Sequence, residues 1–526
     1  MSDTPTPEAP APDGLTLLAE AMGPKLAVID DRPDGTVIQW TFADLEANAN
    51  RLAHVLQSHG AGKGTKVMVC GQNSCWVVAF GHACRKIGAV SVPLNYRLTP
   101  EEAAYVVDNS DCEVALVDAE FADLFHKLRP DAPKLRAILM YDGEPGPDMI
   151  RAAEALDAAP ATPPGPAPTD GGSTMIYTSG TTGKPKGAVR NRVGDPNLIA
   201  QLVGELGYTN DDIYLTTGPL YHSGPSGIMA IAQMLSNTVV LQRKFDAEDW
   251  LRLVDKYRVT STFSAPTPIR RICQLPEDVA RKYDVSSMRI MIANAAPWSF
   301  ALKKLYLERF PAHSLFEIYG STELGINTVL RPEYQLAKPG SCGRPAPGVE
   351  IVLFDEDGNK ITEPHVQGEL YVRSANTFTT YYKAQEKFEE DRRGDYQTVG
   401  DIAYFDEEGF IFICDRKKDM IISGGVNIYP AEIEDALEHH PDIMDVAVFG
   451  IPDEEWGEAI HAVVVIREGA DLAPEAIQAF AREHLAGYKV PRSISYIDEI
   501  PRTGSGKTLK RDLRKPFWDD YDKGVA

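Results

Sequence analysis

The sequence has few cysteines and no long apolar run. Its seven cysteines among 526 residues are odd in number and include no C-x-x-C pair, which argues against a disulfide framework and a zinc site and favours a reducing compartment. No uninterrupted run of 18 apolar residues occurs, so we predict no membrane span. Residues 1–14 carry four prolines without a basic or apolar segment, unlike a secretory or transit peptide, and we expect a cytoplasmic protein.

Basic residues are scarce relative to acidic ones. Lysine and arginine number 53 against 76 aspartates and glutamates, which gives a net charge of −23. This negative excess repels phosphate backbones at long range, so nucleic acid is not expected as a partner. A small anionic ligand would have to be held by local donors against the overall field. The 43% of hydrophobic residues can fill large cores, which excludes disorder of the whole chain.

Residues 41–118 alternate between helical periodicity and short apolar runs. The pattern predicts helices over 41–60, 76–90 and 99–110, and buried strands over 66–71, 91–95 and 112–118. This alternation is typical of a doubly wound α/β fold. A segment with five prolines and three glycines, 159–172, then predicts an irregular surface connection.

The pattern changes after about Lys418. Helical spacing and strand-like runs now predict a compact α+β unit, with helices over 429–440 and 474–485 and strands over 445–450, 460–466 and 493–497. We therefore predict two domains, a large N-terminal one over 14–417 and a small C-terminal one over 418–526.

The segment 177–187, YTSGTTGKPKG, follows an apolar, strand-like run. Its glycines can expose backbone N–H groups to an anion, and hydroxyls and lysines add further donors. The candidate phosphate-binding residues are Thr178, Ser179, Gly180, Thr181, Thr182, Gly183, Lys184 and Lys186. A Walker A loop would need Ser or Thr after Lys184, where Pro185 stands, so a P-loop NTPase is disfavoured.

Four further segments follow in order along the chain. They are YGSTE at 319–323, GD at 400–401, DRKKDMIISGGVNIYPAEIE at 415–434 and PRTGSGK at 501–507. Together with the loop at 177–187 they resemble the motifs of the adenylate-forming (AMP-binding) superfamily, in its acyl-CoA synthetase and fatty-acid–CoA ligase branch. The resemblance implies α/β plus α+β architecture: a large N-terminal domain of paired α/β sheets with a β-rich subdomain, and a small mobile α+β C-terminal domain.

In this family a carboxylate attacks the α-phosphate of ATP, and the site must supply cations and oriented donors because both reactants are anions. The resemblance implies that the 177–187 loop holds the β- and γ-phosphates and that Thr322 contacts the α-phosphate. Glu323 would help to coordinate Mg²⁺, a hard ion that suits oxygen ligands. Lys507 would bridge the attacking carboxylate and the α-phosphate.

The remaining nucleotide contacts are also implied by the resemblance. Asp401 would accept hydrogen bonds from the ribose hydroxyls, and Arg416 would contact the same nucleotide. The adenine would lie against Asn294, Ala295 and Ala296. Tyr319 and Gly320 complete the set of expected nucleotide-binding residues.

Thioester formation needs a second arrangement, which the family reaches by rotating the C-terminal domain. Lys418 matches the hinge position, where a few backbone rotations can swing a rigid unit. Gly424 and Gly425 would then leave room for the pantetheine arm of coenzyme A. Trp456 matches a residue that stacks on the CoA adenine in some relatives, and core packing is the alternative.

The acyl pocket is expected at PLYHSGPSG, 219–227, and beside YGSTE. The candidate lining residues are Tyr221, His222, Ser226, Gly227, Gly325 and Ile326. We expect His222 to pack and gate, with no proton transfer. No Asp or Lys at these positions would select an amino group, which argues against amino-acid substrates.

We thus expect a ligase that joins a hydrophobic carboxylic acid, fatty or bulky cyclic, to CoA with ATP and Mg²⁺, releasing AMP and pyrophosphate. One alternative is transfer of the acyl group to the phosphopantetheine of a carrier protein. Another is a non-catalytic nucleotide-binding scaffold, which the joint presence of Glu323, Asp401 and Lys507 disfavours. The sequence leaves open which acid is used and whether the chain forms a homo-oligomer.

Overall fold

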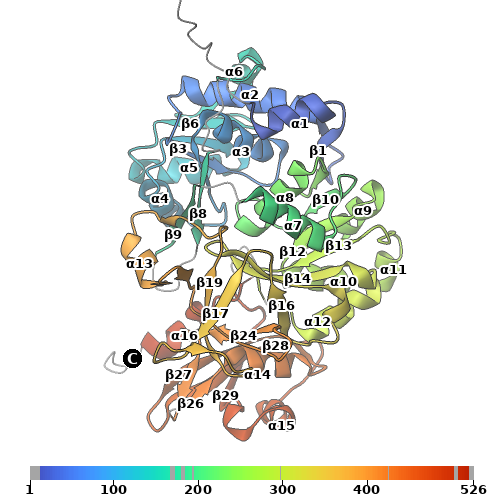
Figure 1. Ribbon diagram of the computed structural model, residues 1–526, viewed down its shortest axis with the longest axis vertical. Coiled ribbons are helices and arrows are strands. Elements are labelled where there is room, and N and C mark those ends of the chain that lie inside the picture. Colours follow the sequence, from blue (N-terminus) through green and yellow to red (C-terminus); the bar gives the residue numbers. More distant parts are fainter. Residues whose placement is uncertain are drawn as a thin grey trace, which may run out of the picture.

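The computed structural model describes residues 12–165, 172–178, 184–191, 195–296, 298–424, 426–502 and 507–519. Two large sheets and their helices form the N-terminal part, and a smaller orange-to-red domain lies at the opposite end of the molecule from α1 and α2 (Figure 1). Among the described helices, none is long and apolar enough to cross a membrane.

The first large sheet has the strand order β20-β9-β8-β4-β3-β5-β6-β7. Its strands are β3 (Lys66–Cys70), β4 (Val90–Pro93), β5 (Val114–Asp118), β6 (Ala137–Tyr141), β7 (Ile150–Arg151), β8 (Ser173–Thr178), β9 (Lys186–Arg190) and β20 (Thr380–Tyr381). The first helices of the chain are α1 (Gly14–Met22), α2 (Phe42–Ser58), α3 (Cys75–Ile87), α4 (Pro100–Asn109), α5 (Ala122–Leu128) and α6 (Ala152–Ala158). The predicted alternation over 41–118 is confirmed.

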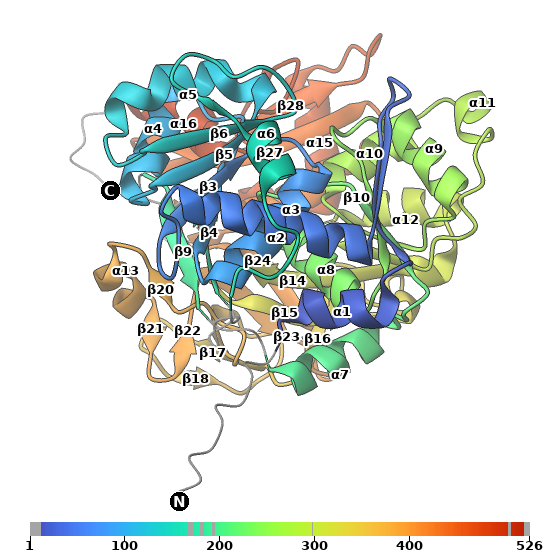
Figure 2. The ribbon, with the colours of Figure 1, turned by 90° about the horizontal axis from the view of Figure 1, so that it is seen from above.

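Helices cover both faces of this sheet, with α2 and α3 on one side and α4 and α5 on the other (Figure 2). The alternation of β3 explains why: Val67 and Val69 pack in the cluster with α2 and α3, whereas Met68 and Cys70 pack in the cluster with α4. Strands β3 and β5 are parallel, so their carboxyl ends open at one edge of the sheet.

The second large sheet begins as a parallel α/β sheet and continues as antiparallel strands. Its α/β strands are β1 (Leu26–Asp31), β2 (Val37–Thr41), β10 (Ile213–Thr216), β11 (Thr238–Leu241), β12 (Ser261–Ser264), β13 (Ile290–Ala293) and β14 (Leu315–Ser321). Its helices are α7 (Pro196–Leu206), α8 (Ser223–Met234), α9 (Ala247–Tyr257), α10 (Pro266–Cys273), α11 (Glu277–Ala280) and α12 (Phe300–Arg309). The Asp195 carboxylate caps α7 by accepting from the backbone N–H of Asn197 at 2.9 Å.

The antiparallel continuation is the β-rich subdomain that the sequence resemblance implied. It contains β15 (Gly325–Leu330), β16 (Ser341–Pro345), β17 (Glu350–Phe354), β18 (Lys360–Ile361), β19 (Gly368–Arg373), β21 (Arg392–Arg393), β22 (Tyr396–Gln397), β23 (Asp401–Phe405), β24 (Ile411–Arg416) and the short helix α13 (Gln385–Glu390). Strands β14 and β15 form a hairpin whose turn faces the first sheet through contacts described below.

The C-terminal domain is a five-stranded sheet with helices packed on it. Its elements are β25 (Ile421–Ser423), β26 (Val426–Ile428), α14 (Pro430–Glu438), β27 (Ile443–Asp453), β28 (Gly457–Ile466), α15 (Pro474–His484), β29 (Ser493–Tyr496) and α16 (Lys510–Asp519). Ile433 and Leu437 of α14 are fully buried in its core, as their helical spacing predicts. The α+β character predicted for this region is confirmed.

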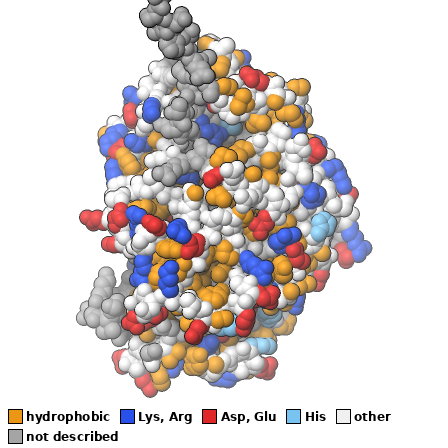
Figure 3. All heavy atoms as spheres, viewed as in Figure 1, with side chains coloured by type: hydrophobic (Ala, Val, Ile, Leu, Met, Phe, Trp, Pro, Cys, Tyr) orange, Lys and Arg blue, Asp and Glu red, His pale blue; other side chains and the backbone are white. Residues whose placement is uncertain are grey.

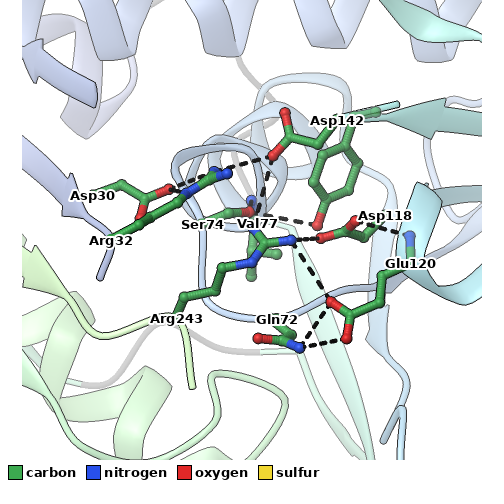
Figure 4. A network of polar contacts seen from close by, with 10 residues as sticks. Asp30, Arg32, Gln72, Ser74, Val77, Asp118, Glu120, Asp142 and Arg243 are labelled. Carbon is green, nitrogen blue, oxygen red and sulfur yellow. Dashed lines mark hydrogen bonds and ion pairs between the residues drawn. The ribbon is translucent and has the colours of Figure 1, made fainter. Parts of the chain in front are cut away.

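A polar network joins the two large sheets where their strands end (Figure 4). The Arg243 guanidinium, after β11, lies 2.6 Å from the Asp118 carboxylate at the end of β5. Arg32, after β1, pairs with Asp30 at 2.8 Å and with Asp142 at 3.2 Å. Burial raises the pKa of Asp118 even though Arg243 opposes the shift. The network therefore ties the ends of β1 and β11 in one sheet to the ends of β5 and β6 in the other.

We expect Arg243→Ala to lower the free energy of unfolding by about 3 kcal/mol, because Asp118 would remain buried without its partner. Chemical denaturation of the full chain measures this loss. Arg281→Ala is the control, since its side chain is 76% exposed and its ion pair should contribute little. Equal stability of the two variants would show that the Arg243 network does not hold the sheets together.

One face of the surface shows positive and negative side chains interspersed among apolar ones, without a single basic patch (Figure 3).

Candidate active site

The turn between β14 and β15 places a buried carboxylate at the start of the predicted phosphate loop. Glu323 is 8% exposed, and its Oε1 accepts hydrogen bonds of 3.1 Å from the hydroxyls of Thr178 and Tyr381. Thr178 ends β8, directly before loop residues 179–183, which lie outside the described residues. The side chains of two predicted site residues, 145 positions apart, are thus in contact.

Two lysines stand at the other end of this loop. Lys184 is exposed, with its ammonium 4.7 Å from the centre of the Tyr105 ring. Lys186 begins β9, which pairs antiparallel with β8. The loop is therefore bounded by a hydroxyl on one side and by two cations on the other, as a phosphate site requires.

Thr322 is held by contacts from two other segments. Its hydroxyl lies 2.7 Å from the hydroxyl of Ser223, the first residue of α8, and its carbonyl accepts from Arg190 at 3.0 Å. Arg190 also donates to the carbonyl of Asn376. Burial lowers the pKa of Arg190 from its usual value. The hairpin turn that carries Thr322 and Glu323 is thereby fixed between β9 and α8.

Asp401 is a buried carboxylate at the start of β23. It is 6% exposed, accepts a hydrogen bond of 2.6 Å from the Tyr319 hydroxyl, and lies 3.4 Å from the Arg416 Nε. Burial raises the pKa of Asp401, and Arg416 and Tyr319 oppose the shift. The carboxylate is therefore oriented by two donors and can accept further hydrogen bonds, the chemistry expected for a ribose contact.

Lys507 comes from the C-terminal domain and lies within electrostatic range of these groups. Burial lowers the pKa of its ammonium, and Arg416 lowers it further. Glu323 and Asp401 act in the opposite direction. The same lysine also lowers the pKa of His222. Lys507 therefore lies close enough to Glu323, Asp401 and His222 to interact electrostatically with each of them.

The expected adenine segment follows β13 at the carboxyl end of the parallel strands. The Asn294 side chain donates to the Ile318 carbonyl at 2.7 Å, and its backbone N–H donates to the Ser264 carbonyl at 3.1 Å. Ala295 has φ of +72°, a strained value for a residue with a side chain. Ala296 completes the segment. Ligands of open α/β sheets bind beside such strand ends.

Aromatic rings cluster at the segment where the acyl pocket is expected. The Tyr221 and His222 ring centres are 4.3 Å apart, and the Tyr96 ring meets Tyr221 edge-on at 5.1 Å. Burial, with Lys507 and Arg97, lowers the pKa of His222 to about 3. Its imidazole is therefore neutral at physiological pH, which suits a packing role.

The small residues predicted to line this pocket have different surroundings. Ser226 donates its hydroxyl to the His222 carbonyl at 2.7 Å, and a Cβ added at Gly227 would meet nothing within 4 Å. A Cβ at Gly320 would lie 2.1 Å from the Gly325 carbonyl oxygen, and one at Gly325 would lie 3.0 Å from the Asn376 carbonyl oxygen. The hairpin itself thus requires Gly320 and Gly325. Ile326 packs beside the main core cluster.

A pocket of about 430 Å³ lies on the C-terminal domain. Its lining residues are Ser423, Gly424, Val426, Ile428, Trp456, Gln478, Arg482, Gly487, Tyr488, Val490, Pro491 and Arg492. Trp456 is 39% exposed, and the Arg492 guanidinium lies 4.8 Å from its ring centre. Core packing, the alternative role for Trp456, does not match this exposure.

Gly424 packs against Trp456. A Cβ at this position would lie 2.5 Å from the Trp456 ring, and its backbone N–H donates to the Trp456 carbonyl at 2.8 Å. The absence of a side chain at Gly424 therefore leaves room for the indole beside it, and Gly424 itself lines the pocket. Gly425 lies outside the described residues.

Several site residues were not predicted. Ser223, Arg190 and Tyr381 bind the turn with Thr322 and Glu323 from distant parts of the chain. Ser223 lies in the 219–227 segment but was not singled out there, and no motif pointed to Arg190 or Tyr381, because their roles depend on contacts that span 132 and 58 residues.

The side chains near the phosphate loop can be compared with those that Mg²⁺ would need. Within the described ranges, no three His, Cys, Asp or Glu side chains form a group that could hold a metal ion. Mg²⁺ is commonly bound through one or two carboxylates, with substrate phosphates and water supplying the other ligands. The single buried carboxylate of Glu323, next to the phosphate loop, fits that kind of binding.

Known proteins resemble this chain over nearly its full length. It matches the AMP-binding enzyme family over residues 18–382 and the AMP-binding enzyme C-terminal domain over 432–507. A feruloyl-CoA synthase from Amycolatopsis sp is 34% identical, with 92% of this chain and 95% of the relative covered. The long-chain-fatty-acid–CoA ligase FadD13 of Mycobacterium tuberculosis is 32% identical, with 92% and 94% covered.

Solved structures agree with this assignment. The ATP-bound MatB of Rhodopseudomonas palustris is 27% identical with a TM-score of 0.85, and 97% of this chain and 99% of that chain are covered. The chain therefore belongs to the adenylate-forming AMP-binding enzyme family, in its acyl-CoA synthetase branch, and is an AMP-forming acid–thiol ligase.

Proposed function

We propose that this enzyme converts a hydrophobic carboxylic acid, fatty or bulky cyclic, into its CoA thioester through a bound acyl-adenylate. The observation that supports this proposal most is that Lys507, a residue of the C-terminal domain, lies within electrostatic range of Glu323 and Asp401 in the N-terminal part. A cation that can be delivered to, and withdrawn from, a nucleotide site suits a two-step reaction.

In the first step, the carboxylate oxygen attacks the α-phosphorus and pyrophosphate leaves. Lys507 would bridge the two anions and stabilise the charge that develops between them, while Thr322 would donate to the α-phosphate. Asp401 would hold the ribose, with Arg416 and Tyr319 keeping its carboxylate in place. These groups act by position and charge, and none becomes covalently modified.

Glu323 would hold Mg²⁺ together with the phosphates. When bound, the ion neutralises charge on the phosphates and on the departing pyrophosphate. Thr178 and Tyr381 orient the Glu323 carboxylate through its Oε1.

In the second step, the CoA thiol attacks the acyl carbon and AMP leaves. We propose domains over 14–417 and 418–526, with rotation about Lys418, in the connection between β24 and β25. Burial lowers the pKa of Lys418, and Arg416 and Arg511 add to this. Rotation would withdraw Lys507 and present the C-terminal pocket, where Trp456 would stack on adenine.

The acyl specificity is supported by the aromatic wall and by the relatives. Tyr96, Tyr221 and neutral His222 offer apolar surface without a fixed charge toward the acyl chain. Relatives include a feruloyl-CoA synthase, a fatty-acid ligase and an indoleacetate–CoA ligase from Aromatoleum aromaticum that is 33% identical. We therefore expect an apolar acid.

A panel of carboxylic acids, supplied with ATP, Mg²⁺ and CoA and analysed by mass spectrometry, tests this function. We expect a thioester and AMP in equal amounts from apolar aromatic or aliphatic acids. Formation of acyl-AMP without any thioester would favour transfer to a carrier protein, as in a fatty acid–[acyl-carrier-protein] ligase from Streptomyces coeruleorubidus that is 33% identical. If none of the acids gave an adenylate, the proposal would be contradicted.

Trp456→Ala should raise the KM for CoA about tenfold, because loss of one base–aromatic stack costs about 1.4 kcal/mol. Adenylation should not change. Tyr496→Ala is the control, since it removes another exposed aromatic ring, 40% exposed, from the same domain. Pantetheine lacks the adenine, so its KM should be equal in wild type and Trp456→Ala. A tenfold effect on pantetheine as well would place Trp456 elsewhere.

A further inference from the structure

Arg270 of helix α10, in the N-terminal part, contacts the C-terminal domain. The Arg270 guanidinium donates to the Met444 carbonyl at 3.0 Å and pairs with the Glu438 carboxylate at 3.2 Å. It also lies 4.0 Å from the Asp445 carboxylate. These three partners belong to α14 and β27, and the Arg270 side chain is only 22% exposed.

Asp445 links this contact to the segment that carries Lys507. Its carboxylate accepts from Arg502 through both oxygens, at 2.8 and 2.7 Å. Arg502 donates in turn to the Thr508 hydroxyl at 3.0 Å, and the backbones of Arg502 and Thr508 form an isolated β-bridge. Arg502 and Thr508, which flank residues 503–507, are therefore joined to each other, and Arg502 is also joined to Asp445.

We propose that Arg270 is a positioning residue for adenylation, which holds the C-terminal domain in the arrangement that places Lys507 in the site. This inference rests on the proposed roles of Lys507 and of the domain rotation. Arg270 is not among the residues to which we assign contacts with the nucleotide or the acid. It acts through Glu438 and β27, and through Asp445 on the base of the Lys507 segment.

The chemistry of the contact between Arg270 and the C-terminal domain suits a reversible interdomain contact, which we call the latch. Arginine presents several donors in a fixed plane, so one side chain satisfies a carbonyl and a carboxylate at once. The carboxylates that face Arg270 are largely but not fully buried, with the side chains of Glu438 18% and Asp445 17% exposed. Water can therefore take the place of the Arg270 guanidinium at these carboxylates when the domain turns. When the domain turns, Asp445 keeps its bidentate partner Arg502, since both lie in the C-terminal domain.

The neighbouring Arg271 provides a matched control. Its guanidinium lies 5.5 Å from the Phe245 ring within the N-terminal part. Replacing either arginine with alanine removes the same side chain and the same positive charge from α10. Only Arg270 has side-chain partners in the C-terminal domain among the contacts described above.

The kinetic test separates the two half-reactions. We expect Arg270→Ala to slow acid-dependent exchange of pyrophosphate into ATP about tenfold, and to leave thioester formation from supplied acyl-AMP unchanged or faster. Arg270→Lys should recover part of the exchange rate, and Arg271→Ala should affect neither reaction. Glu438→Gln combined with Arg270→Ala should cost less than the sum of the two single effects. Equal loss in both half-reactions would overturn the positioning role.

A distance measurement tests the latch without catalysis. Spin labels on cysteines introduced at Arg281 and Glu468, both exposed, report the separation of the two domains. We expect one main distance in the ligand-free protein and a second population in Arg270→Ala, but not in Arg271→Ala. An unchanged distribution in Arg270→Ala would overturn the latch. If wild type exchanged no pyrophosphate with any acid, the proposed function would fail, while the distances would still decide whether Arg270 holds the domain.

Discussion

Lys507→Ala is expected to slow adenylation by about 10²–10³-fold, the scale for losing one preorganised charge stabiliser. The ammonium interacts electrostatically with Asp401, Glu323 and His222, the groups near which we propose that the attacking carboxylate and the α-phosphate meet. Thioester formation from supplied acyl-AMP should be largely retained, because Lys507 is withdrawn in that step. Pyrophosphate exchange and CoA transfer are measured on the same preparation.

Two controls accompany this variant. Lys282→Ala removes a lysine whose side chain is 57% exposed, and should change neither half-reaction. Lys507→Arg keeps the charge on a larger head and should recover only part of the rate, since the ammonium occupies a confined position. A Lys507→Ala variant that loses both half-reactions equally would contradict an adenylation-specific role.

Glu323→Gln is expected to reduce adenylation by about 10²-fold and to raise the Mg²⁺ concentration needed for half-maximal rate. Glutamine has the same shape and can still accept from Thr178 and Tyr381 through its carbonyl oxygen, so the hairpin turn should persist. What is lost is the negative charge that would hold the ion. Pyrophosphate exchange measured against Mg²⁺ concentration gives both values.

Glu333→Gln provides the comparison for Glu323, because Glu333 is 51% exposed and pairs with Arg331 at the surface. It should not alter the Mg²⁺ dependence. A Glu323→Gln enzyme with reduced rate but unchanged Mg²⁺ dependence would place the carboxylate in a purely structural role within the turn.

Local patterns predicted much of the fold. Apolar spacing in 41–60 and a buried run in 66–71 correspond to α2 and β3, because each element buries one face or both faces against the sheet. The order of five motifs indicated the family, and the matching domains confirm it. Contacts between distant segments did not follow from these patterns.

The site shows why. Motifs identified Glu323, yet its partners Thr178 and Tyr381 are 145 and 58 residues away, and only the fold brings them together. The motif led us to expect room for pantetheine at Gly424, but it did not indicate that the Trp456 ring packs against this glycine. The interdomain contact of Arg270 has no sequence signal, since it requires the packing of α10 on a separate domain.

The most direct test is acid-dependent exchange of isotopically labelled pyrophosphate into ATP. Reversible cleavage between the α- and β-phosphates, by the acid's own oxygen, predicts labelled ATP only when a suitable acid and Mg²⁺ are both present. AMP should accumulate with the thioester once CoA is added. Absence of exchange with every acid of the panel, or formation of ADP in place of AMP, would contradict adenylation by this protein.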